Sequence, residues 1–110
     1  MLYHKIMNDT DEMLWRLITE NEGREFHTTK GLPFTYTIKK GRTGEPLGEL
    51  IISRREKSIT RSTILLAYET AQKVTETEGC VKGPKKLGVF GASYIYPILI
   101  ELGLITNQKE

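Results

Sequence analysis

The sequence has little of what disulfide or metal stabilisation requires. Its 110 residues include one cysteine, Cys80, and two histidines, His4 and His27. A single cysteine excludes a disulfide within the chain and suits a reducing cytosol, where its simplest role is that of a small, inert, buried residue. No Cys, Asp or Glu stands at zinc-ligand spacing around either histidine. We therefore expect no metal site and no cofactor.

Long apolar runs are also absent. The longest nearly apolar stretch, residues 89–100, contains Gly91, Ser93 and Pro97 and is far shorter than the roughly 20 residues of a membrane span. Residues 1–9 have neither the apolar region nor the small-residue cleavage pattern of a signal peptide. These absences predict a soluble, cytoplasmic protein that does not enter a membrane.

The sequence contains no recognisable catalytic constellation. Neither Cys80 nor any serine stands in a known nucleophile turn, and a triad would need a histidine base and an orienting acid beside it. The glycine-rich residues 79–91 lack the residue order of a phosphate-binding P-loop. We expect that the protein is not an enzyme, and an enzymatic function stays an alternative.

The residues that are present are typical of a globular domain. Hydrophobic residues make up 38% of the chain and charged residues 27%, which is ordinary usage for folded proteins. A chain of this length forms one domain with one modest core. We therefore expect a single domain over residues 1–110.

Three helical segments are predicted. Residues 9–22 carry an apolar stripe at helical spacing, with Asp9 and Glu12 placed as a capping box. Thr60 is a good N-cap for a second helix ending at Gly79, and Ile59 and Ile64 are spaced as a hydrophobic staple. Pro84 suits the first position of one helical turn. Residues 93–102 form the last helix, which either kinks at Pro97 or begins near it.

A small antiparallel sheet of about three strands is predicted between the first two helices. Phe34, Tyr36 and Ile38 alternate with polar residues, which is typical of a half-buried strand. Residues 47–53 complete a hairpin with it, and residues 25–29 form a short further strand. The predicted fold is α+β: an N-terminal helix in residues 1–23, the sheet in 25–53, a helical segment in 58–105 and a polar tail in 106–110.

Positive charge is concentrated in two stretches, although the net charge is only +2. Residues 30–61 carry eight basic and three acidic side chains, and residues 82–86 add three lysines. Residues 1–25 hold three basic and six acidic side chains. Such segregation favours an anionic partner, and the alternative is an unevenly charged, solvated surface.

The first basic cluster precedes the second helix and consists of Arg54, Arg55, Lys57 and Arg61. The free N–H groups and positive dipole of a helix N-terminus suit a phosphate, and arginine adds two parallel donors. The alternative is a solvated connection from strand to helix. Lys39, Lys40 and Arg42 lie at the tip of the predicted hairpin.

The second basic cluster consists of Lys82, Lys85 and Lys86 and is followed by Ser93, Tyr94 and Tyr96. Lysine could hold the phosphate backbone while small polar and aromatic side chains contact sugar or base. For Tyr94 we favour packing in the core. For Tyr96 both alternatives stay open, so Ser93 and Tyr96 join the candidate nucleic-acid contacts.

Residues 91–105, which read Gly-Ala-Ser-Tyr-Ile through Leu99 to Glu-Leu-Gly-Leu-Ile, resemble the last helix of helix-turn-helix and winged-helix domains. The resemblance implies that residues 58–79 and 84–87 are the preceding helices. With these helices included, it covers about 45 residues. It also implies that Ser93, Tyr94 and Tyr96 face a major groove. Three features depart from that pattern: the hairpin comes first, Pro97 interrupts the helix, and the helix lacks Arg, Asn and Gln. The whole chain also resembles short proteins of Gram-positive bacteria and their mobile elements, which implies no activity.

Two functions follow from these features. The first is nucleic-acid binding, with DNA favoured over RNA, through phosphate and shape contacts of the basic residues rather than through base reading. The second is a protein-binding inhibitor or adaptor, for example one encoded by a mobile element, whose basic strip meets an acidic partner. Trp15 and Tyr3 would then matter more than the lysines. A homodimer is a further expectation, because a three-stranded sheet leaves edges that can pair.

Overall fold

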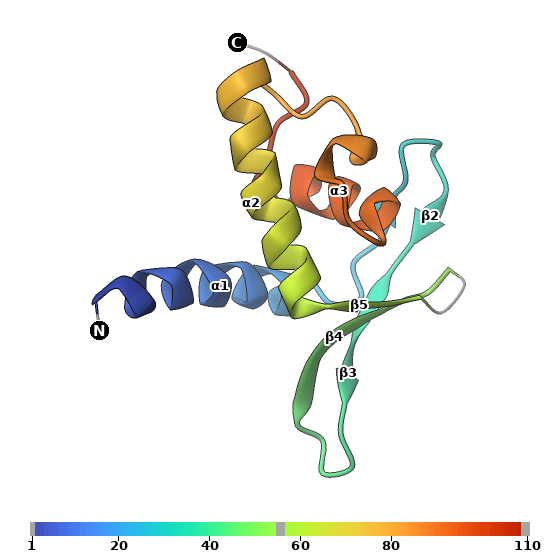
Figure 1. The fold of residues 1–110 in the computed structure, drawn as a ribbon. Helices are drawn as coiled ribbons and strands as arrows, with labels where there is room; N and C mark the ends of the chain where they lie inside the picture. Colours follow the sequence, from blue (N-terminus) through green and yellow to red (C-terminus); the bar gives the residue numbers. More distant parts are fainter. Residues whose placement is uncertain (1, 55–56, 109–110) are drawn as a thin grey trace.

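The protein was analysed as a computed structural model that describes residues 2–54 and 57–108, with the backbone alone for residues 2–8. The described elements are, in order, α1 (Leu2–Glu20), β1 (Phe26–His27), β2 (Pro33–Phe34), β3 (Tyr36–Lys40), β4 (Pro46–Ile52), β5 (Ser58–Thr60), α2 (Arg61–Glu78), the short 3₁₀ helix η1 (Pro84–Leu87) and α3 (Ala92–Glu101) (Figure 1). The predicted α+β class is confirmed, because helices and antiparallel strands occupy separate stretches of the chain.

The larger sheet has the order β3-β4-β5 and is antiparallel throughout. The predicted hairpin is present, with Tyr36 opposite Ile52 and Ile38 opposite Leu50. The strand β5 extends the sheet by placing Ile59 opposite Leu50. All five side chains are at most 3% exposed. One face of this sheet therefore belongs to the core, while the alternating side chains such as those of β3 face solvent.

The third strand of this sheet differs from the prediction. Residues 25–29 do not join it, since β1 pairs with β2 in a separate two-stranded sheet in which Phe26 is opposite Phe34. The chain then continues through Thr35, whose N–H donates to Ser53 Oγ over 2.9 Å, into β3. Alternation of polar and apolar residues predicts which face of an extended segment is buried, but it does not predict the pairing partner.

The strand β5 lies in a segment that the sequence indicated only as a connection to the second helix. It contains three residues, of which Ile59 alone is buried. The N–H of Ile52 donates to Lys57 O over 2.7 Å and brings the two strands together. A strand this short has no visible period of its own, so its pairing could not be found from the sequence pattern.

The first helix begins earlier than predicted. It starts at Leu2, so Asp9 and Glu12 are exposed residues inside the helix and do not form a capping box. No Gly or Pro in residues 2–8 interrupts the helix. Acidic residues on the solvent face of a helix have the same spacing as a capping box, which explains the error. Trp15 is half-buried against the core.

The second helix has the predicted ends. The Thr60 hydroxyl accepts a hydrogen bond from the Thr63 N–H over 3.3 Å and thereby caps the first turn. Ile59 and Ile64 on either side of this cap are both buried. The helix ends at Glu78, and the N–H of Gly79 donates to Thr75 O over 2.8 Å.

The last helix begins five residues before Pro97, which lies inside it. Its end has a Schellman arrangement: the Gly103 N–H donates to Ile100 O and the Leu104 N–H donates to Leu99 O, each over 3.0 Å. Leu104 returns to the edge of the core. Helix α3 packs against α2, η1 and β1, so it connects the helical side of the fold to the small sheet.

Aromatic side chains connect the two sheets to α3. The rings of Phe26 and Phe34 stack with centroids 5.9 Å apart, and Phe34 meets Tyr94 edge to face at 5.2 Å. Phe26 also stacks on Tyr36, whose hydroxyl donates to the carbonyl of Ile18. Burial raises the pKa of Tyr36 well above its usual range. The hydroxyl therefore stays protonated and keeps this link to α1.

The bend at Gly91 fixes how α3 enters the core. Gly91 has φ of +76°, and a Cβ there would lie 2.7 Å from Ile59 Cδ1. We expect Gly91→Ala to destabilise the fold by about 2–5 kcal/mol, since a left-handed backbone costs about 1–2 kcal/mol and overpacking about 1–3 kcal/mol. The matched control is Gly103→Ala, with φ of +74° and no neighbouring atom within 4 Å. In urea titrations, equal losses for both variants would contradict the contribution of close packing.

Candidate nucleic-acid interface

A basic groove lies where the β1–β2 turn meets η1 and the start of α3. Its volume is about 850 Å³, and it is open to solvent. We call it the lysine groove; its lining residues are Thr29, Lys30, Lys82, Gly83, Pro84, Lys85, Lys86, Gly88, Val89, Ala92 and Ser93. Residues separated by more than 50 positions in the sequence thus share one surface.

Local backbone geometry places the lysines of both walls. In the β1–β2 turn, the Gly31 N–H donates to Thr28 O over 2.8 Å, and the Thr28 N–H donates to Leu32 O over 2.9 Å. Lys30 is therefore held at the tip of a closed turn. On the other wall, Leu87 is 1% exposed and anchors η1 in the core, while Lys85 and Lys86 on the same short helix stay exposed.

The electrostatic character of the groove is positive. Lys30, Lys82, Lys85 and Lys86 are all exposed, and the described lining contains no Asp or Glu. Lys86 forms an ion pair with Glu78 over 3.1 Å, outside the groove lining. Ser93 lies in the first turn of α3, where the positive end of the helix dipole favours an anion. Clustered amines without carboxylates attract anions.

A second basic region lies next to the groove, beside Phe90. The Lys57 Nζ is 4.8 Å from the centroid of the Phe90 ring and 6.0 Å from that of Tyr94. The Arg54 Nη1 donates to the carbonyl of Pro33 over 3.4 Å, so the arginine lies against β2. These contacts bring the β4–β5 connection to the side of the molecule that carries the start of α3.

The structure brings together only part of the predicted basic strip. Lys82, Lys85, Lys86 and Ser93 share the groove, and Lys57 lies close to it through Phe90. Arg55 lies outside the described residues. The predicted hairpin-tip residues are exposed at the end of the β3–β4 hairpin, which points away from the helices (Figure 1); they are Lys39, Lys40 and Arg42.

Arg61 contacts a different part of the molecule from the other predicted cations. Its Nε donates to Asp11 Oδ1 over 2.9 Å, and its guanidinium lies 5.4 Å from the Trp15 ring centroid. Both partners are on α1, so Arg61 holds α1 against the start of α2. Its charge is balanced within the fold and is not part of the lysine groove.

Both tyrosines of α3 are buried. Tyr94 is 8% exposed, as expected for a core residue, and Tyr96 is 3% exposed. The Tyr96 hydroxyl donates to Val81 O over 2.7 Å, and burial raises its pKa. Of the two alternatives that the sequence left open for Tyr96, the structure shows packing in the core. Of the three residues that the helix-turn-helix resemblance directs toward a groove of DNA, only Ser93 is exposed.

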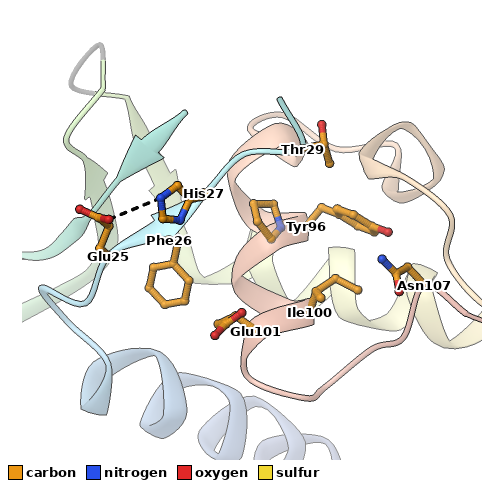
Figure 2. Close-up of a pocket in the computed structure, with 9 residues that line it drawn as sticks. Glu25, Phe26, His27, Thr29, Tyr96, Ile100, Glu101 and Asn107 are labelled. Carbon is orange, nitrogen blue, oxygen red and sulfur yellow. Dashed lines mark ion pairs between the residues drawn. The ribbon is translucent and has the colours of Figure 1, made fainter. Parts of the chain in front are cut away.

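A second cavity of about 390 Å³ lies between β1, α3 and Asn107 (Figure 2). Several of its polar groups contact protein atoms. His27 Nε2 lies 3.4 Å from Glu25 Oε2, and Glu101 accepts a hydrogen bond from Arg24 over 2.7 Å. The Tyr96 hydroxyl donates to Val81 O.

Two residues of the interface were missed from the sequence. Lys30 belongs to a turn that is far from Lys82 in sequence, and only the pairing of β1 with β2 brings them together. Phe90 is 64% exposed although it stands in a nearly apolar stretch. A signal for Phe90 exists in retrospect, because a large aromatic between Gly88 and Gly91 is placed in a bend and not on a buried helix face.

Comparison of the chain with protein-family models, with curated proteins and with solved structures found no match. Among the residues described, no group of three or more His, Cys, Asp or Glu side chains is placed to hold a metal ion. No helix in the described ranges has the length and apolar character needed to cross a membrane. A functional assignment therefore depends on the geometry and charge of the lysine groove.

Proposed function

We propose that this protein binds nucleic acid, DNA before RNA, by holding backbone phosphates in the lysine groove. The observation that supports this most is the convergence of four lysines from two distant parts of the chain on one open groove, whose described lining has no carboxylate. Lysine contacts to phosphate do not read sequence. The burial of Tyr94 and Tyr96 agrees with backbone contacts and not with base reading by α3. We also propose that the protein is located in the cytoplasm.

The salt dependence of binding tests this function. We expect the affinity for a labelled oligonucleotide to fall linearly on a log–log plot against salt concentration. The slope is about −0.7 per neutralised phosphate on a single strand and about −0.9 on duplex DNA. With four groove lysines, the total slope is therefore about −3. Fluorescence anisotropy across a salt series measures it, and absence of binding at low salt would contradict the proposal.

The second candidate function is a protein-binding module. Two exposed apolar side chains beside the groove support it: Phe90 is 64% exposed and Leu32 is 44% exposed. A protein interface with an apolar centre depends mainly on an aromatic anchor and only weakly on salt. A partner bound with a nearly flat salt dependence and without any oligonucleotide affinity would favour this function over nucleic-acid binding.

A further inference from the structure

Phe90 is the most exposed large apolar side chain among the described residues, at 64%. It stands in the short bend between η1 and α3. Beside it, Gly91 has φ of +76° and lies against the buried Ile59 side chain, which constrains the backbone path through the bend. A ligand that covers the exposed ring would remove its apolar surface from water.

Phe90 lies between two residues that line the lysine groove. Val89 precedes it and Ala92 follows it by two positions. On its own surface the ring carries Lys57, whose Nζ lies 4.8 Å from the ring centroid. Positive charge therefore lies on both sides of the exposed ring, from the groove and from Lys57.

This combination of ring and amines matches the alternation of base and phosphate in a single strand. Phosphates bind amines, and unstacked bases stack on aromatic rings whatever their identity. In a duplex, neighbouring base pairs already cover the faces of each base, so an exposed ring gains no stacking partner there. Stacking on Phe90 therefore favours a single strand over a duplex, whereas the lysines alone do not distinguish the two.

We propose that the preferred ligand is single-stranded nucleic acid, with its phosphates in the lysine groove and a base stacked on Phe90, an inference that rests on the proposed phosphate-binding function. Charge selects this occupant over an apolar protein segment. Such a segment would cover Phe90 equally well, but it would leave the exposed groove amines of Lys30, Lys82 and Lys85 without an anionic partner.

The test compares Phe90 variants on three kinds of ligand. Oligo-dT and oligo-U of about 12 nucleotides, a duplex, and a strand of equal charge with abasic positions are titrated by fluorescence anisotropy. Stacking is worth about 5- to 150-fold in affinity per base. We expect Phe90→Ala and Phe90→Leu to lose that factor on the base-bearing strands and to bind the duplex and the abasic strand unchanged. Phe90→Tyr is the matched control, which keeps the ring and the affinity.

The outcomes separate this inference from the proposed function. If duplex and single strand bind equally and Phe90→Ala changes neither affinity, base stacking is overturned. Phosphate binding in the groove would then remain. Full affinity of Phe90→Leu would show that the contact is apolar rather than aromatic, and would overturn it as well. Absence of all oligonucleotide binding would remove both. Because Phe90 is exposed, circular dichroism is expected to show unchanged folding for each variant.

Discussion

We expect oligonucleotide binding to weaken about 100-fold at 0.1 M salt in the triple variant Lys30→Ala/Lys82→Ala/Lys85→Ala. All three line the groove, and they make no ion pair with other described residues. Their loss removes amines without leaving a carboxylate unpaired. Each phosphate contact on a single strand contributes about fivefold at this salt concentration, so three contacts give a factor near one hundred. The salt slope is expected to become shallower by about 2.

The control is Lys39→Ala/Lys40→Ala/Arg42→Ala, which removes the same number of charges from the hairpin tip. Of these three, Lys39 also pairs with Glu49, with Nζ 3.9 Å from Oε2. These residues are exposed and lie away from the groove (Figure 1). We expect the control to change affinity less than about threefold, through the net charge alone. If the two triple variants lose affinity equally, binding follows the overall charge of the protein and the groove is not its site. Anisotropy titrations of both variants at several salt concentrations distinguish these results.

The largest effect on stability is expected from Leu50→Ala. Leu50 is on the central strand β4, opposite Ile38 on one side and Ile59 on the other, and it is 0% exposed. Removing its side chain leaves a cavity that neighbours on both flanking strands cannot fill. We expect a loss of about 2–5 kcal/mol, which is a large part of the roughly 5–15 kcal/mol that stabilises a domain. Thermal melting is expected to move down by about 10 °C or more.

Leu66→Ala is the control for this prediction. Leu66 is on α2 and is 53% exposed, so the same change of side chain removes little packing, and alanine favours a helix. We expect a change within about 0.5 kcal/mol. Urea denaturation measures both variants, with the midpoint moving for Leu50→Ala at an unchanged slope. A loss for Leu50→Ala that is no larger than that for Leu66→Ala would contradict the position of Leu50 in the core.

The sequence by itself determined the elements whose signals are local. Thr60 marks the start of α2 and Gly79 its end, because capping depends on residues within one turn. Phe34, Tyr36 and Ile38 are all buried as their alternation predicts. Gly103 ends α3 as expected. The α+β class follows from these signals, and so does the grouping of Lys82, Lys85 and Lys86, which are neighbours in the chain.

The tertiary structure alone decided which distant residues share a surface. The pairing of β1 with β2 brings Lys30 to the lysines of η1, whereas Arg61 is drawn to Asp11 and Trp15 on α1. It also decided that Tyr96 is buried while Phe90, six positions earlier, is exposed. Composition and periodicity describe each segment separately. Strand partners, helix contacts and the direction of a bend depend on long-range packing, because many pairings satisfy the same local pattern and the shared core selects one of them.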